Sequence, residues 1–399
     1  MINFSHIFSE LKNIAPILIV SFVLVLLVTP LVGKLAKAIG AVDLAKYERG
    51  RSKVSKKKKR FLKKRNIPRL GGLGVSFVFS VIFFYTQGFN PFSISVGLAT
   101  LLITIIGFLD DLYDLHGGIQ LIVQIVCIMV VVLSGVRISS IQVFGYFLNF
   151  SHFSWVIPFS NDILKFVFPA DLITLVWFIV ITNAMNWVSG IDALEETMSW
   201  VAGATIMLLA IKFSNPVILV SASIFTACVF AFWIFNFPPA KILSGTIGNF
   251  LYGFLLAIFA IKIDGKMTTS ILLLALPIVD FVWVIIWRIF KFKIINPFKL
   301  LSISGKHHLH HRFLAIGYTK KQVLLIESCM FLISAIFAYF FAGFNIFAIA
   351  ALSSIAVFLL FFIFLSYLNI RKKKLTEKLP KGVIAPAEIK KSPDKEYAY

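Results

Sequence analysis

The sequence predicts an all-α integral membrane protein with about eleven transmembrane helices, and its composition gives two reasons. Hydrophobic residues make up 59% of the 399 residues and charged residues 14%, whereas soluble domains average about 25% charge. The chain also carries 43 Phe beside only 18 acidic residues, which is more aromatic surface than one globular core can hide. The bilayer is therefore the expected surroundings of most of the chain.

Apolar runs of the length needed to cross a bilayer follow one another along the chain. A window of about 19 residues finds eleven: 15–33, 70–87, 93–109, 120–136, 169–187, 197–212, 216–235, 247–263, 270–288, 322–342 and 346–369. The long aromatic connection 137–168 is predicted to lie at the membrane surface, as a hairpin or an amphipathic helix. Residues 1–369 are expected to form the membrane-embedded domain, and 370–399 a basic, disordered cytoplasmic tail.

Lys and Arg are unevenly divided between the two faces of the predicted bundle. If the loop 34–69 is cytoplasmic, 33 of the 39 Lys and Arg fall on that side. The positive-inside rule then predicts an external N-terminus and a cytoplasmic C-terminus in the plasma membrane. A basic face attracts anionic lipid. The basic run 51–65 could also suggest nucleic-acid binding, but no aromatic platform accompanies it, so no nucleic-acid partner is expected.

Two predicted cytoplasmic loops contain carboxylates and no Lys or Arg. In GFLDDLYDL, helical spacing places Asp110 and Asp114 on one face with Asp111 one step round. Like charges this close repel unless a cation or a proton lies among them. Hard divalent cations bound by oxygen fit that need, and a solvated helix end is the alternative.

The second of these loops, NAMNWVSGIDALEE, contains amide side chains. Asn183 and Asn186 lie one helical turn apart, Ser189-Gly190 breaks the helix, and Asp192 follows. Amide side chains can donate hydrogen bonds to phosphate or sugar oxygens, and their oxygens can bind a metal. An ordinary helix C-terminus with Asn and Gly as caps explains the same pattern.

The third motif, NFPPAKILSGTIGNF at 236–250, opens a helix with Gly residues. Lys241 is its one basic residue, and Gly245 and Gly248 flank Thr246. A Gly-rich helix N-terminus facing the cytoplasm is a plausible phosphate cradle. Close helix packing accounts for the Gly residues equally well.

The fourth motif, KHHLHHRF at 306–313, gathers four of the seven His of the chain. A zinc site is one interpretation, but no Cys or suitably spaced acid accompanies the His residues. Beside carboxylates and a basic loop, a set of donors for a pyrophosphate group is favoured, and a solvated His run remains the alternative. Together with an apolar bundle, the four motifs indicate phosphoryl transfer involving a lipid.

In this order the motifs resemble those of the polyprenyl-phosphate N-acetylhexosamine-1-phosphate transferases, relatives of the phospho-N-acetylmuramoyl-pentapeptide translocase. The matching stretches are IPRLGG, GFLDDLYDL, NAMNWVSGID, NFPPAKILSGTIGN, LPIVD ending at Asp280, and HLHHRF. The form HLHHR is closer to the N-acetylglucosamine-phosphate branch. The resemblance implies transfer of a sugar-1-phosphate from a UDP-sugar to polyprenyl phosphate, releasing UMP, in synthesis of envelope glycans such as peptidoglycan or lipopolysaccharide.

The resemblance also implies Mg²⁺, or Mn²⁺ in its place, and a set of site residues on the cytoplasmic face. We expect three groups of residues: catalytic Asp110, Asp111, Asp192 and His308; substrate-binding Asp114, Asn183, His310, His311, Arg312 and Lys241; and metal-binding Asn186, Asp111 and Thr246. Asp110 or Asp111 would take the proton from, or orient, the lipid phosphate. The partners are thus the two substrates and anionic lipid, and a homodimer is left open.

Four positions depart from the family pattern. Ser189 and Thr246 stand where the family has Asp, Gln120 where it has Lys, and Gly305 where an acid is common. A neutral hydroxyl is a poorer Mg²⁺ ligand than a carboxylate. The alternative function is therefore a catalytically impaired relative that binds lipid phosphate or serves as a scaffold. A transporter using the intramembrane acids Asp280 and Glu327 is a third hypothesis, although no repeat relates their helices.

Overall fold

The computed structural model describes residues 4–43, 67–143, 146–159, 162–263, 267–302, 305, 307–343 and 367. The helices in this part of the chain are α1 (Phe4–Ile39), α2 (Gly71–Gln87), α3 (Pro91–Tyr113), α4 (Gly117–Leu133), α5 (Ala170–Val188), α6 (Leu194–Lys212), α7 (Pro216–Asn236), α8 (Gly245–Lys262), α9 (Met267–Leu273), α10 (Ala275–Phe292), α11 (Pro297–Ser302), α12 (Leu309–Ile316) and α13 (Lys320–Phe341). The strands are β1 (Val42–Asp43), β2 (Ile67–Pro68), β3 (Ser140–Val143), β4 (Tyr146–Asn149), β5 (Ser151–Phe159) and β6 (Asp162–Pro169).

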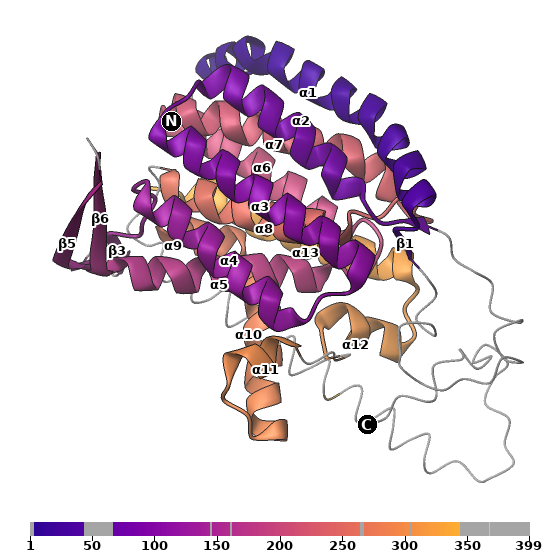
Figure 1. Cartoon of the computed structure of the whole chain (residues 1–399). Coiled ribbons are helices and arrows are strands. Elements are labelled where there is room, and N and C mark those ends of the chain that lie inside the picture. The colour runs from indigo at the N-terminus through magenta and orange to yellow at the C-terminus, as the bar shows by residue number, and fades with distance from the viewer. Residues whose placement is uncertain are drawn as a thin grey trace, which may run out of the picture.

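The long helices form a bundle arranged around α8 (Figure 1). Within the most apolar stretch of each helix, 83% of the residues are buried in α6 and α8, against 22% in α1. Helix α1 lies along the outside, against α2 and α7. The exposed side chains of the outer helices are large and apolar, for example Leu27 at 62% and Leu101 at 54%. Such an outer surface is stable in lipid, so the chain is a multi-pass membrane protein.

Several helices begin where the sequence supplies a cap. The Asn90 side chain accepts from the backbone N–H of Ser93, and the backbone N–H of Asn90 donates to the Ser93 hydroxyl, which makes a capping box around Pro91. Thr319 and Gln322 form the same arrangement at the start of α13. These caps satisfy backbone N–H groups that a helix N-terminus leaves unpaired.

Ten of the eleven predicted runs are helices in the structure, and the run 346–369 lies almost wholly outside the described residues. Within the described part, seven helices are long and apolar enough to cross a membrane by themselves. The run 270–288 is instead two helices, α9 and α10, that meet at an angle of 77° and can count as one broken span. Helices α2 and α4 are apolar and shorter, at 17 residues each. The count of eleven spans is therefore not reproduced by length and composition alone.

The prediction of an all-α fold was wrong for the segment 137–168. This segment forms two antiparallel pairs, β3 with β4 and β5 with β6, and the second pair contains a bulge at Ser151 and Phe153. The hairpin alternative was thus the right one. The alternation of aromatic and polar residues suits a two-sided strand, and the helix alternative would have required a period of 3.6. A third small pair, β1 with β2, lies at the other end of the bundle beside Arg69.

Candidate active site

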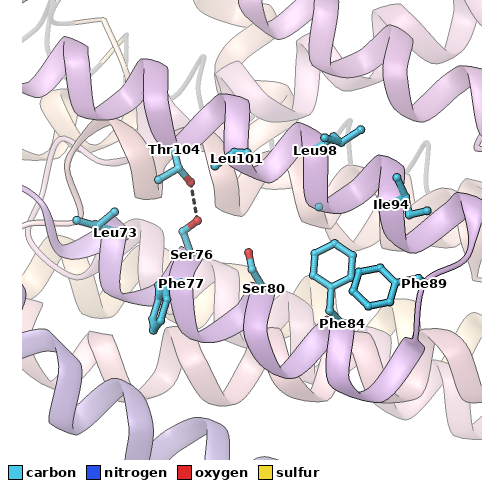
Figure 2. A pocket seen from close by; sticks show the side chains of 11 residues that line it. Leu73, Ser76, Phe77, Ser80, Phe84, Phe89, Ile94, Leu98, Leu101 and Thr104 are labelled. Atoms are coloured by element: carbon cyan, nitrogen blue, oxygen red, sulfur yellow. Dashed lines mark hydrogen bonds between the residues drawn. The ribbon is translucent and has the colours of Figure 1, made fainter.

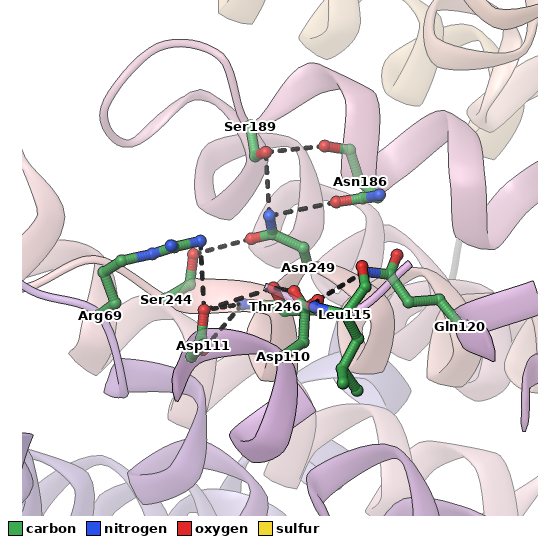
Figure 3. A network of polar contacts seen from close by, with 10 residues as sticks. All are labelled: Arg69, Asp110, Asp111, Leu115, Gln120, Asn186, Ser189, Ser244, Thr246 and Asn249. Carbon is green, nitrogen blue, oxygen red and sulfur yellow. Dashed lines mark hydrogen bonds and ion pairs between the residues drawn. The ribbon is translucent and has the colours of Figure 1, made fainter. Parts of the chain in front are cut away.

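Helix ends from distant parts of the sequence meet at one end of the bundle. Helices α3 and α5 end there, and α2, α4 and α8 begin there (Figure 3). The approach of α2 to α8 is very close: a Cβ on Gly72 would lie 2.2 Å from the backbone nitrogen of Gly248. Gly at position 72 therefore allows the backbone of α2 to touch that of α8. This contact sets Arg69, just before α2, beside Thr246 at the start of α8.

Asp110, in the last turn of α3, receives hydrogen bonds from three sides. Its Oδ1 accepts from the side chain of Gln120 at 2.7 Å and from the backbone N–H of Leu115 at 2.9 Å. Its Oδ2 accepts from the hydroxyl of Thr246 at 2.5 Å. The carboxylate is 8% exposed. Hydrogen bonds of this kind compensate for burying its charge.

Asp111, the next residue, is held by one cation and by the start of α8. The guanidinium Nη2 of Arg69 lies 3.2 Å from its Oδ1. The backbone N–H of Thr246 donates to both carboxylate oxygens, at 3.2 and 3.0 Å. A carboxylate facing a helix N-terminus is stabilised by the unpaired N–H groups there.

Gly245 makes room for this arrangement. Its φ is +70°, and a Cβ there would lie 1.8 Å from the carbonyl oxygen of Arg69 and 2.2 Å from Oδ2 of Asp111. Both the backbone conformation and the lack of space require Gly. The Gly-rich helix start thus receives a carboxylate of the protein itself, and this carboxylate lies where the sequence suggested a phosphate.

The amide-containing motif reaches the same network through Asn249. Its side chain lies 3.2 Å from Oδ1 of Asn186, 3.0 Å from Oγ of Ser189 and 3.0 Å from Oγ of Ser244. With the amide turned over, its nitrogen donates to Glu195 at 2.8 Å, and its oxygen accepts from Ser189, to which the nitrogen donates in the first orientation. In either orientation Asn249 joins the end of α5 to the start of α8.

A cavity of about 460 Å³ lies over this network. Its lining residues are Asp43, Arg69, Ser189, Gly190, Ile191, Asp192, Glu196, Asn236, Leu243, Ser244, Gly245, Asn249 and Lys320. Asp192 accepts weakly from the backbone N–H of Ala240 at 3.4 Å. Glu196 is 2% exposed and accepts from Asn236 at 2.7 Å. Carboxylates, amides and two cationic side chains on one concave surface suit a polar ligand that carries both hydroxyls and charge.

The His motif packs against the wall of this cavity. A Cβ on Gly190 would lie 2.3 Å from Nε2 of His310, so the two segments are in contact. The His308, His310 and His311 rings have centroids 4.3 to 6.3 Å apart. Burial lowers the pKa of Arg312 to about 10, and nearby Asp280 opposes that change. Arg312 therefore keeps its positive charge at neutral pH.

None of the six residues predicted to bind substrate lines the cavity, and Asp192 is the one expected site residue that does. The helix ends at Tyr113, so Asp114 adopts φ +54° and is exposed, off the face it was expected to share with Asp110. Asn183 is buried and donates to Gln124 of α4 at 2.9 Å. Lys241 is exposed. Asn183 lies on a helix as predicted, but its side chain binds Gln124 of the neighbouring helix α4 and does not face the cavity.

Several residues of the network were not among the expected site residues. They are Arg69, Glu195, Glu196, Asn236, Ser244 and Asn249. Arg69 lies in the IPRLGG stretch, and its place between a basic loop and a Gly pair was a usable signal. The two Glu lie three and four residues after Asp192, and acids at the start of an apolar helix are a site hypothesis by default.

The oxygen-rich surroundings of Asp110 and Asp111 can be tested for Mg²⁺. Proteins hold this ion through one or two carboxylates, and substrate phosphates and water complete the shell. Among the described residues, no three His, Cys, Asp or Glu side chains converge as a metal site. Asp110 and Asp111 therefore fit an ion that is shared with a phosphorylated substrate, whereas a cage built from protein ligands alone does not fit.

Known proteins with similar sequences give independent information about the family of this chain. A Bacillus subtilis protein named probable undecaprenyl-phosphate N-acetylglucosaminyl 1-phosphate transferase is 28% identical over 80% of this chain and 82% of its own. Two proteins named phospho-N-acetylmuramoyl-pentapeptide-transferase are also similar. The one from Lactobacillus helveticus is 29% identical over 66% of this chain and 80% of its own. The one from Carboxydothermus hydrogenoformans is 24% identical over 73% and 89%.

A family model agrees with these relatives. The model described as glycosyl transferase family 4 matches residues 93–264. That range contains Asp110, Asp111, Asp192 and Thr246, and so most of the network around the cavity. Over residues 93–264 the chain is thus similar to glycosyl transferase family 4, and the protein is a transferase enzyme.

Proposed function

We propose that the protein transfers a sugar-1-phosphate, from a UDP-N-acetylhexosamine, to polyprenyl phosphate and releases UMP. The observation that carries the proposal is the position of Asp110 and Asp111 beside a polar cavity at one end of a membrane bundle. A membrane-anchored acceptor and a water-soluble donor can meet only at such an end. The names of two relatives support this substrate pair. One name contains undecaprenyl phosphate and N-acetylglucosaminyl 1-phosphate, and the other contains phospho-N-acetylmuramoyl-pentapeptide.

The reaction exchanges one phosphoanhydride bond for another. An oxygen of the lipid phosphate bonds to the phosphorus that carries the sugar, and the bond from that phosphorus to the UMP oxygen breaks. UMP leaves with the electron pair. Because both reactants are anions, their approach requires positive charge. Mg²⁺ held by Asp110 and Asp111 together with the diphosphate would supply part of it.

The protein's own residues supply the rest of the positioning. Arg69 points its guanidinium at Asp111 from the cavity wall and can contact a phosphate there. Asp110 or Asp111 takes the proton from the lipid phosphate or orients it. His308, His310, His311 and Arg312, on the far side of Gly190, donate to the diphosphate or the sugar. Asp192 lines the cavity and accepts from a hydroxyl or amide of the donor.

The prenyl chain has a matching groove between α2 and α3 (Figure 2). This groove of about 540 Å³ is lined by apolar side chains and by Ser76, Ser80 and Thr104, of which Ser76 and Thr104 are hydrogen-bonded to each other at 2.5 Å. Thr104 lies six residues before Asp110 on α3, or about 9 Å at 1.5 Å per residue. We therefore propose that the lipid phosphate reaches Asp110 while its chain lies in this groove.

The same proposal includes the membrane arrangement. Eleven spans, with the N-terminus outside and the cavity on the cytoplasmic face of the plasma membrane, agree with the uneven distribution of Lys and Arg. The cavity end carries Arg69 and Lys320, and Arg69 is the last residue of the basic stretch 34–69 of the sequence. Envelope glycan synthesis would then draw UDP-sugars from the cytoplasm.

A catalytically impaired relative is the second candidate, and one observation favours it. The hydroxyl of Thr246 lies between Asp110 and Asp111, where the family motif has a third acid. In this case the protein binds polyprenyl phosphate without transferring sugar to it.

The two candidates are separated by an activity assay. Purified protein is mixed with undecaprenyl phosphate, Mg²⁺ and each of a panel of UDP-sugars, and UMP release is measured. Release with at least one UDP-N-acetylhexosamine supports the transferase. No release with any donor, together with restored release in the double variant Ser189→Asp, Thr246→Asp, supports the impaired relative.

A further inference from the structure

One face of α10 carries three side chains that each contact a basic residue of the His motif. Asp280, Trp283 and Trp287 are spaced i, i+3 and i+7, so they form one stripe on the helix. Asp280 contacts His308, Trp283 lies under the Arg312 guanidinium at 4.9 Å, and Trp287 stacks on His307 at 3.5 Å. The His motif is thus built onto α10 residue by residue.

Asp280 makes the strongest of these contacts. It is 4% exposed, and its Oδ2 lies 2.8 Å from Nδ1 of His308. Its Oδ1 accepts from the backbone N–H of Leu309 at 2.8 Å. One carboxylate therefore fixes both the ring of His308 and the first N–H of α12, which has no side-chain cap of its own. Two bonds to adjacent residues leave the ring little freedom to turn.

Trp187 holds the same ring from the other side. Its ring is tilted by 35° relative to that of Phe281, with the centroids 4.7 Å apart, and it meets His308 edge-on at 5.2 Å. The guanidinium of Arg288 lies 4.3 Å from its ring centre. Since Trp187 belongs to the amide-containing motif on α5, this packing joins the His motif to the cavity wall at Ser189 and Gly190.

We propose that Asp280 is a positioning residue that acts through His308 in sugar-phosphate transfer, an inference that rests on the proposed function. A carboxylate accepts, so Nδ1 carries the hydrogen of the shared bond, and Nε2 is the nitrogen left for substrate. A fixed Nε2 can donate to a phosphate oxygen when the ring is charged. The arrangement orients a group before substrate arrives, which lowers the cost of binding the transition state.

This role also accounts for an acid inside the membrane bundle. Asp280 and the buried Glu327 of α13 interact electrostatically, and such acids commonly mark an ion pathway. Here Asp280 is already engaged by His308 and Leu309, so the His motif explains its presence. A transport function is therefore not needed to explain the presence of Asp280.

A double-mutant cycle tests whether Asp280 acts through His308. Asp280→Asn and His308→Gln are each expected to lower kcat/KM for the UDP-sugar on the order of 10–100-fold, and the double variant to be no worse than His308→Gln alone. Asp280→Glu, which keeps a carboxylate, should recover part of the loss. Independent, multiplying losses would overturn the proposal, because they would mean that Asp280 contributes without His308.

Asp171→Asn is the matched control. Asp171 is also a buried helical Asp. Its Oδ2 accepts from the backbone N–H of Val167 at 2.7 Å, and its Oδ1 forms an ion pair with Nε of Arg137 at 3.2 Å. It lies at the opposite end of α5 from the site. Its kcat/KM should stay at the wild-type value.

A second measurement needs neither activity nor an Asp280 variant. In protein labelled with ¹⁵N-histidine, the His308 signals are identified by their loss in His308→Gln, and the hydrogen on each ring nitrogen is read from two-bond couplings. Nδ1–H supports the proposal, and a ring with hydrogen on Nε2 alone overturns it. If wild-type protein releases no UMP with any donor, the proposed function fails, whereas the NMR result still decides whether Asp280 fixes the ring.

Discussion

The hydroxyl of Thr246 donates a hydrogen bond to Asp110 across 2.5 Å, and the backbone N–H of the same residue donates to Asp111. One neutral residue thus binds both carboxylates of the acidic motif. A third carboxylate at this position would repel both of them unless a cation lay between. We therefore propose that the chain trades cation affinity for hydrogen bonds at the centre of its site (Figure 3).

Replacing Thr246 by Asp should reverse this trade. Added negative charge should tighten Mn²⁺ or Mg²⁺ binding about tenfold or more, and the metal-free protein should melt a few degrees lower because three acids then repel. Manganese binding is followed by electron paramagnetic resonance in detergent. Thr246→Val is the control: it loses the hydrogen bond without gaining charge, so it should melt lower and bind no more metal. Equal metal affinity in the Asp variant and wild type would contradict this account.

Arg69 should be required as a cation and not merely as a space-filling side chain. Arg69→Ala leaves Asp111 without its ion pair, and kcat/KM should fall on the order of 100-fold, as when a preorganised donor is lost. Arg69→Lys should retain more activity, because it keeps the charge but not the planar fork. Similar losses in Ala and Lys variants would show that geometry matters here and charge does not.

Gly245 should tolerate no side chain. Gly245→Ala introduces a Cβ 1.8 Å from a carbonyl oxygen at a φ of +70°, so both melting temperature and UMP release should drop sharply. Gly135 provides the comparison, since its φ is +96° but no atom lies within 4 Å of the point that a Cβ would occupy. Gly135→Ala should therefore cost only the backbone strain, about 1–2 kcal/mol, and leave activity intact.

Filling the α2–α3 groove should affect the lipid substrate alone (Figure 2). Leu101→Trp places a large ring in the groove, and KM for polyprenyl phosphate should rise about tenfold with KM for the UDP-sugar unchanged. Leu27→Trp puts the same ring on the lipid-facing side of α1 and should change neither value. A rise in both KM values for Leu101→Trp would place the prenyl chain elsewhere.

His307 should make the folded protein less stable in mild acid. Burial and the nearby Lys291 and Arg312 lower its pKa to about 4 from 6.5. Between these two values the unfolded chain binds a proton that the folded chain does not, so the free energy of unfolding falls as pH drops from 6.5 toward 4. Melting temperatures at pH 7 and pH 5 should differ less in His307→Gln than in wild type. His152→Gln, at an exposed position in β5, should keep the wild-type difference.

The sequence located the helices and the four motifs better than it located the partners of single residues. Hydrophobic runs mark helices because burial in lipid depends on composition and length. Asp114 shows the limit: its spacing predicted a shared face with Asp110, but the helix ends one residue earlier, at Tyr113. Helix ends depend on local backbone choices that spacing does not reveal.

Hydrogen bonds between residues far apart in the sequence could not be predicted, for a different reason. The bond of Asn183 to Gln124 joins residues 59 positions apart, and that of Asn249 to Asn186 joins residues 63 apart. Which side chains meet is decided by how helices pack, and several packings satisfy the same apolar pattern. The segment 137–168 was undecided between helix and hairpin because its aromatic residues suit both at a membrane surface.

The contact of Gly72 with Gly248 has a mechanical consequence. Because no side chain separates α2 from α8 at this point, the two backbones cannot slide or separate there without losing close contact. We therefore expect the part of the site that carries Arg69, Asp111 and Thr246 to be rigid, with the same conformation in the presence and absence of substrate. Movement that admits and releases substrates is then expected in other parts of the cavity lining.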